Sequence, residues 1–233
     1  MKPVLLTLTL LLASFITARR PIAAPVQQPP DHDRATQQPP SAQQIWSDLI
    51  AGNQRFVAGK TKSRDLIKMR ESLTKDQHPK AVVLACSDSR VSPELLFDQS
   101  LGELFVVRSA GNIADSIGVG SIEYAVEHLG TSVLVVLGHT KCGAVTAACS
   151  KEKMPSSNLQ AIVDKIGPAD SRAGKSAAGD ALIEAAVKEN IHQSARDVLA
   201  SSEVLRHFVE DGKLKVFEAE YQLDTGRVIR LEK

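Results

Sequence analysis

The sequence predicts an α/β protein in which a mostly parallel central β-sheet is flanked by helices, with an N-terminal helical arm and a C-terminal edge strand. Continuous apolar runs, typical of strands buried on both faces, alternate along the chain with segments of helical periodicity. Hydrophobic residues make up 43% of the 233 residues and charged residues 24%, the mix of a globular protein with its own core. Lys and Arg total 28 against 27 Asp and Glu, which excludes a strong charged field for nucleic acid.

The N-terminal region is expected to lie outside the domain. Residues 4–16 form an apolar run that suits a secretory signal and falls short of the roughly 20 residues of a membrane span. An uncleaved anchor or a buried helix is the alternative. Residues 21–44 include six Pro and six Gln and cannot bury much apolar area. We therefore expect a signal peptide at 1–20, a disordered linker at 21–44 and a domain at 45–233. The protein would then be exported, most simply into a bacterial periplasm, or be cytoplasmic if the first segment is not a signal.

The elements of the domain follow from periodicity and from turn residues. Helical spacing or flanking glycines predict helices at residues 45–60, 117–129, 142–149, 159–166 and 180–199, and a short one up to residue 209. Apolar or alternating runs predict strands at residues 81–86, 104–107, 132–137, 214–222 and 228–231. The alternating order favours parallel strand pairing, with ligands bound beyond the carboxyl ends of the strands.

Metal-ligating side chains follow the first and third of the predicted strands. Cys86 ends the first strand, and His139 and Cys142 follow the third in the segment GHTKCG. Two thiolates and an imidazole are ligands that zinc prefers, and three protein ligands leave a fourth position open, as in catalytic zinc sites. A buried Cys and an ordinary His are the alternative for either motif alone. Their joint occurrence at two strand ends favours a zinc site.

A carboxylate and a guanidinium accompany the first predicted ligand. Asp88 follows Cys86 by two residues, and Arg90 follows Asp88 by two more. Asp88 could be the fourth metal ligand, or it could accept a hydrogen bond from the metal-bound water. Arg90 would keep the carboxylate ionised and oriented in either case.

Residues 81–148, which include ACSDSR and GHTKCGAV, closely resemble the β-class carbonic anhydrases. The resemblance extends more weakly to the C-terminal LRHFVEDGKLKVFEAEYQLDTGRV. It implies that Cys86, His139 and Cys142 hold one zinc ion per chain. It further implies reversible hydration of carbon dioxide to bicarbonate and a proton.

The resemblance also implies roles for Asp88 and Arg90, which match a pair of residues in that family. In the open state of the family the Asp binds the zinc-bound water, and in the closed state it leaves the Arg and ligates zinc. Members known for the closed state carry a Trp where this chain has Val83. The resemblance therefore favours the plant-like, open subtype.

A substrate pocket is implied by the same comparison of motifs. Gln77, Phe105 and Tyr124 stand where plant-like members have a Gln, a Phe and a Tyr. We expect these side chains and the Gly143 N–H to line the pocket, although Phe105 and Tyr124 would be core residues in most proteins.

Other functions and an assembly state also follow from the sequence. Hydrolysis of carbon disulfide or carbonyl sulfide would use the same site, and a non-catalytic zinc- or bicarbonate-binding protein is a different class. A homodimer or larger assembly is expected, because Ile45, Leu49 and Phe56 of the first helix need an apolar partner. In the resembled family an N-terminal helix packs on the neighbouring subunit. Residues 169–176 match a loose phosphate-loop pattern by chance, since no strand precedes them.

Overall fold

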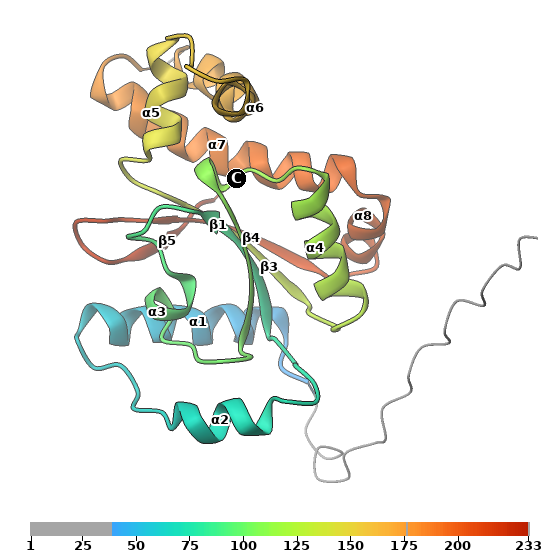
Figure 1. Cartoon of the computed structure of the whole chain (residues 1–233). Helices are drawn as coiled ribbons and strands as arrows, with labels where there is room; N and C mark the ends of the chain where they lie inside the picture. The colour runs from blue at the N-terminus through green and yellow to red at the C-terminus, as the bar shows by residue number, and fades with distance from the viewer. Residues whose placement is uncertain (1–38, 176, 233) are drawn as a thin grey trace, which may run out of the picture. The chain divides into compact units, whose positions relative to one another are not determined.

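The structure, a computed structural model, describes residues 39–175 and 177–232 and is built on a central five-stranded sheet (Figure 1). The strands are β1 (Ala81–Cys86), β2 (Leu104–Ser109), β3 (Val133–His139), β4 (Lys215–Tyr221) and β5 (Val228–Arg230). Their order is β2-β1-β3-β4-β5, and only β5 runs antiparallel to its neighbour. The mostly parallel sheet and its C-terminal edge strand are thus confirmed.

Helices cover both faces of the sheet. They are α1 (Ala42–Val57), α2 (Leu66–Ser72), α3 (Pro93–Leu96), α4 (Ser116–Glu127), α5 (Gly143–Ser150), α6 (Ser157–Ala173), α7 (Asp180–Ser201) and α8 (Glu203–Glu210), with a 3-10 turn, η2 (Ala110–Asn112). The sequence analysis does not predict α2, a helix of seven residues none of which is buried. In the described part of the chain, no helix combines the length and apolar character that crossing a bilayer requires.

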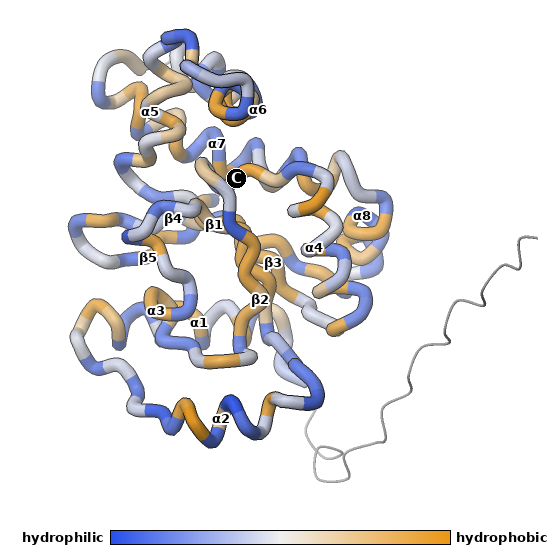
Figure 2. Tube along the Cα trace, viewed as in Figure 1, coloured by the Kyte–Doolittle hydropathy of each residue, from blue (hydrophilic) through white to orange (hydrophobic). Residues whose placement is uncertain are grey.

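Strands β1 and β3 are almost entirely apolar because each side of the sheet has its own core (Figure 2). Val82 and Leu84 of β1 pack into the core formed with α4 to α8, and the alternate residues Val83 and Ala85 pack into the core formed with α1 and α3. Strands β1 and β3 are parallel neighbours, so their carboxyl ends lie side by side at one end of the sheet. The loops that follow these ends carry polar residues.

The first helix begins three residues before the predicted domain boundary at residue 45. Ser41 and Gln44 form a capping box, in which the Ser41 N–H donates to Gln44 Oε1 at 2.8 Å and the Gln44 N–H donates to Ser41 Oγ at 3.3 Å. Residues 42–44 therefore belong to α1 and not to the linker. The predicted signal peptide at 1–20 and linker residues 21–38 lie outside the described residues.

The apolar face of α1 is buried within its own chain. Ile45, Trp46 and Leu49 are at most 5% exposed, and the Trp46 ring stacks on Phe217 of β4 with a centroid distance of 4.8 Å. The expectation that this helix needs a second subunit as its apolar partner is therefore wrong. The sequence could not show that the β4 face lies under α1.

Candidate metal centre

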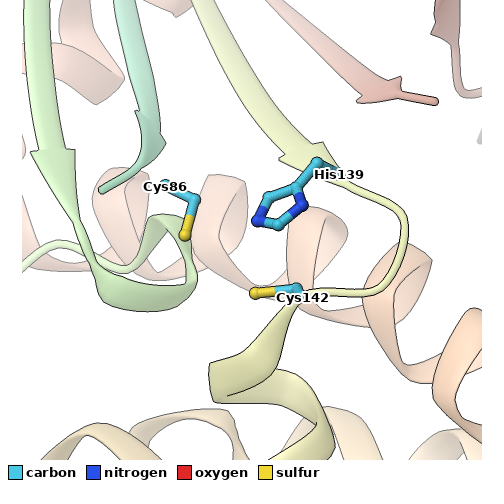
Figure 3. Close-up of side chains that lie close together, drawn as sticks. All are labelled: Cys86, His139 and Cys142. Carbon is cyan, nitrogen blue, oxygen red and sulfur yellow. The ribbon is translucent and has the colours of Figure 1, made fainter. Parts of the chain in front are cut away.

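Three buried side chains meet at the carboxyl end of the sheet (Figure 3). Cys86 is the last residue of β1, His139 is the last residue of β3, and Cys142 directly precedes α5. Their ligand atoms all lie within 4.8 Å of one another. The two predicted motifs thus form one cluster because β1 and β3 are adjacent parallel strands.

A tight turn carries the chain from His139 to Cys142. Lys141 adopts a left-handed conformation, with φ of 57°, and the Thr140 N–H donates to the Tyr221 carbonyl at 3.0 Å. Cys142 occupies the N-cap of α5, so the helix presents its first N–H groups to the sulfur. The N–H groups of Ala144 and Val145 lower the pKa of the Cys142 thiol, but its bond to Cys86 and its burial outweigh them.

The orientation of His139 fits metal ligation. Its Nδ1 lies 2.9 Å from the Thr140 carbonyl, which requires Nδ1 to carry the proton and leaves Nε2 with a free lone pair. His139 is fully buried, and Nε2 has no hydrogen-bond partner among the described residues. A buried acceptor without a partner is costly, and a metal ion at this point would remove that cost.

The two thiols are coupled through a hydrogen bond. The bond from Cys142 lowers the pKa of Cys86 to about 4, against the effect of burial. The same thiol–thiolate bond, followed by burial, raises the pKa of Cys142 above its ordinary value. One thiolate is therefore present near neutral pH, and the donor set of two sulfurs and one imidazole nitrogen fits zinc.

Asp88 lies beside the cluster but is bound by Arg90. Arg90 Nε and Nη2 donate to the two carboxylate oxygens at 2.9 and 2.7 Å, and the Arg90 N–H donates to Oδ1 at 2.9 Å. The Arg90 hydrogen bonds hold the pKa of Asp88 well below its usual range. Asp88 Oδ2 is 3.9 Å from His139 Nε2. The carboxylate thus has the open arrangement expected from the sequence, next to the three ligands and not as a fourth one.

The four residues expected to line the substrate pocket separate into two groups. Gly143 is exposed beside the ligand cluster, and a Cβ built on it would meet no atom within 4 Å. Phe105 pairs with Val82 at the opposite end of the strands, roughly 13 Å along the sheet from Cys86.

Gln77 and Tyr124 belong with Phe105 at that opposite end. Gln77 is exposed and precedes the amino end of β1, and the Tyr124 ring lies 6.2 Å from that of Phe105. Within one chain, these three residues therefore do not reach the metal site. The parallel register of β1 and β2, which the sequence does not reveal, separates them from it.

Two residues that the sequence analysis does not identify, Arg108 and Gly111, donate hydrogen bonds to the segment that carries Cys86 and Asp88. Arg108 Nε donates to the Cys86 carbonyl at 3.1 Å, and its Nη2 donates to the Asp88 carbonyl at 2.7 Å. The Gly111 N–H lies 3.3 Å from Cys86 Sγ and donates to it. The run RSAGN at the end of the second predicted strand could have indicated these two residues, because a parallel strand beside β1 must end near Cys86.

The described part of the loose phosphate-loop pattern, residues 169–175, does not have the structure of a phosphate loop. Residues 169–173 are the last turns of α6, where Arg172 donates to Glu189 at 2.9 Å and also to Gln193. A phosphate loop would instead join a strand to a helix.

Known proteins resemble this chain over most of the described region. The carbonic anhydrase family model matches residues 81–228. Carbonic anhydrase 2 of Mycobacterium tuberculosis is 36% identical over 188 residues, which cover 79% of this chain and 90% of that protein. Carbonic anhydrase of Mycolicibacterium smegmatis is 38% identical over 187 residues, covering 78% and 90%. The structure of the Coccomyxa β-carbonic anhydrase in complex with acetazolamide matches with a TM-score of 0.65 and 26% identity, covering 82% of this chain and 84% of that one.

Proposed function

The chain belongs to the β-class carbonic anhydrases and catalyses the reversible hydration of carbon dioxide with zinc as cofactor, and from this premise we propose roles for its residues. The observation that carries the assignment to this site is the buried cluster of Cys86, His139 and Cys142 at the end of two parallel strands. Cys86 Sγ, His139 Nε2 and Cys142 Sγ would hold the zinc ion. Zinc held there supplies a Lewis acid that makes water reactive near neutral pH.

Asp88 is the positioning group for the attacking water. Its depressed pKa keeps the carboxylate ionised, so that it can only accept a hydrogen bond. Because Arg90 occupies both oxygens from one side, the remaining lone pairs of Oδ2 face the cluster at 3.9 Å from His139 Nε2. The carboxylate thus accepts a hydrogen bond from the attacking water. This bond orients a lone pair of the water oxygen toward the substrate.

Gly143 leaves room for the substrate next to Cys142. It is the first residue of α5, and the space beside its Cα is open. A helix N-terminus favours negative charge, which develops on the oxygens of carbon dioxide as bicarbonate forms. The absence of a side chain at this position lets those oxygens approach the backbone.

Stopped-flow measurement of carbon dioxide hydration tests this function. We expect activity that tracks the zinc content and is lost in Cys142→Ser, with Cys149→Ser as the matched control. Cys149 is the remaining free cysteine, and it lies on α5 outside the ligand cluster. Zinc-replete protein that binds bicarbonate without turnover, or that hydrolyses only carbon disulfide or carbonyl sulfide, would contradict it.

We also propose that the enzyme is a homodimer, in which each chain completes the substrate pocket of the other. Gln77, Phe105 and Tyr124 lie too far from the ligands of their own chain, and Tyr124 is 46% exposed. Strand β2 lies at an edge of the sheet, and edge strands are commonly covered by another segment or another chain. A second copy that covers β2 would bring its own metal site toward these side chains.

We further propose that the enzyme is exported to a bacterial periplasm. The support is the apolar run at residues 4–16, followed by a Pro- and Gln-rich segment at 21–38 that suits a tether outside the domain. Cell fractionation, together with N-terminal sequencing of the mature chain, tests this. A cytosolic protein that still begins at Met1 would contradict export and leave the catalytic function untouched.

A further inference from the structure

The backbone turn η2 lies directly behind Cys86. Within it, Gly111 has φ of 74°, and its N–H donates to Cys86 Sγ across 3.3 Å. A hydrogen bond to a ligating sulfur stabilises the negative charge on that sulfur and fixes where its lone pairs point. Whatever holds Gly111 therefore controls both the position and the charge of a zinc ligand.

Neighbouring helices confine this turn by packing. A Cβ at Gly111 would lie 2.7 Å from Ile166 Cδ1 of α6 and 3.3 Å from the Cβ of Ala144 of α5. Packing alone restricts the turn on those sides but does not fix the direction of its peptide groups. That direction requires a hydrogen bond.

A buried amide on α7 makes such a bond. Asn190 is 1% exposed, and its Nδ2 donates to the Gly111 carbonyl at 2.7 Å. The next residue of the turn, Asn112, points Nδ2 at Ser194 Oγ, one helical turn further along α7, at 3.5 Å. Helix α7 thus holds η2 at two successive residues.

The Asn190 amide lowers the stability of the fold, so stability alone does not explain its presence at this position. Its Oδ1 is buried and has no hydrogen-bond partner among the residues that the structure describes. A buried polar atom without a partner destabilises a fold, and an apolar side chain of similar volume would avoid this. The one bond that Asn190 does make points at the turn behind the zinc ligand.

We propose that Asn190 is a positioning residue for the zinc site, which acts through Gly111 on the sulfur of Cys86. The proposal rests on the zinc-dependent function given above. Without the Asn190 bond, the Gly111 N–H withdraws from Sγ, and the sulfur carries more unshielded charge in a less defined position. The site then binds its metal more weakly and with altered sulfur electronics.

The test compares Asn190→Leu, which keeps the side-chain volume, with the wild-type enzyme after replacement of zinc by cobalt(II). Removal of a hydrogen bond from a thiolate raises the energy of its lone pairs, so we expect the sulfur-to-cobalt charge-transfer absorption to move to longer wavelength. Competition with a chelator should show zinc affinity lowered about 10- to 100-fold.

Gln193→Leu is the matched control. Gln193 lies on the same helix, is 7% exposed, and donates to the Lys165 carbonyl at 3.0 Å without a hydrogen bond to η2. We expect its loss to lower stability without moving the absorption band. A shift of the same size in this control would overturn the proposal, because it would show that general loosening of α7 is sufficient.

Further measurements keep the outcomes separate. If Asn190→Leu does not fold, Asn190→Ala decides, since it removes the amide donor and adds no group that can donate to Gly111. In the wild-type chain carrying cadmium-113, a scalar coupling between the metal and the Gly111 amide proton is expected through Sγ. A folded Asn190 variant with an unmoved band, or the absence of that coupling, overturns the inference. A wild-type enzyme without any sulfur-to-cobalt band would instead contradict the zinc site itself.

Discussion

Arg90 binds both carboxylate oxygens of Asp88, with 2.9 Å from Nε to Oδ1 and 2.7 Å from Nη2 to Oδ2. The two residues are separated by one position, so the pair forms locally and does not depend on distant packing. Its consequence is that the Asp88 side chain, 17% exposed, remains ionised next to the three zinc ligands. An ionised acceptor at this place is what the hydration reaction requires.

Asp88→Asn should retain zinc and lose activity about 10- to 100-fold, the usual effect of removing a partner behind a metal site. The amide keeps the shape, but its NH2 group can face the water and misdirect it. Stopped-flow hydration rates and the zinc content of the same sample check this.

Asp211→Asn is the matched control for Asp88→Asn. Lys213 Nζ lies 2.7 Å from Asp211 Oδ2, so this pair also joins a carboxylate to a cation two residues later. It lies on the exposed turn after α8, and its loss should leave the rate unchanged. Equal rates for wild type and Asp88→Asn at equal zinc content would show that Asp88 only supports the loop.

Zinc removal should lower the melting temperature of the domain. A ligand present at 100 times its Kd stabilises a protein by about 2.7 kcal/mol, which is about 5–10 °C for a domain of this size. Removal leaves His139 Nε2 buried without a partner among the described residues. Elemental analysis should give one zinc per chain, and calorimetry with and without a chelator measures the shift. An unchanged melting temperature on full zinc loss would argue against a site built into the core.

A buried carboxylate outside the ligand cluster should govern stability at low pH. Asp98 is 3% exposed, and it accepts hydrogen bonds from Arg55 Nε at 2.5 Å and Arg64 Nη1 at 2.7 Å. Burial would raise the pKa of Asp98, but the bonds from Arg64 and Arg55 outweigh burial and lower it. A depressed pKa stabilises the folded chain above the ordinary Asp value of about 3.9, and this contribution is lost as the pH falls through the folded value.

Asp98→Asn should therefore destabilise the domain by about 3 kcal/mol at pH 7, the lower end of the effect of breaking a buried ion pair. Asn tolerates the left-handed backbone at this position, where φ is 46°, so the change isolates the charge. Urea unfolding at pH 7 and below pH 4 measures it, with both proteins kept free of zinc. The difference between the two proteins should shrink at the lower pH. A difference independent of pH would show that shape and not charge matters at residue 98.

The sequence was sufficient to predict the sheet and the zinc ligands for a physical reason. Strands β1 and β3 are buried on both faces, which makes them continuous apolar runs, and the ends of adjacent parallel strands meet. Cys86 and His139 therefore had to lie close together once the parallel order was assumed. Ser41 and Gln44 also have the spacing of a capping box, but the Pro- and Gln-rich composition continues through residue 44 and favours a boundary at residue 45.

The remaining features depend on contacts between distant segments. The position of Phe105 relative to the metal is fixed by its pairing with Val82, and no local pattern reveals which residues of two strands pair. The burial of Trp46 against Phe217 is likewise tertiary. A motif can therefore identify a pocket residue without showing which chain's pocket it enters.

This last point gives a prediction about shared active sites. If Gln77 serves the neighbouring subunit, a Cys142→Ser chain and a Gln77→Ala chain should complement each other in a mixed dimer. The Gln77→Ala chain supplies intact zinc ligands, and the Cys142→Ser chain supplies the intact Gln77 to that site. We expect each variant alone to be impaired and the mixed dimer, co-expressed with two different tags and purified on both, to recover about half of the wild-type rate, because one of its two sites is complete.

Mixed dimers of Cys142→Ser with Asp88→Asn are the control, since both changes fall on the same side of the pocket. That pairing also leaves one wild-type ligand set, but the set carries the altered carboxylate, so no recovery is expected. Light scattering checks that the particles are dimers. A stable, active monomer, or a mixed dimer no more active than the Gln77→Ala protein, would show that each chain builds its pocket alone.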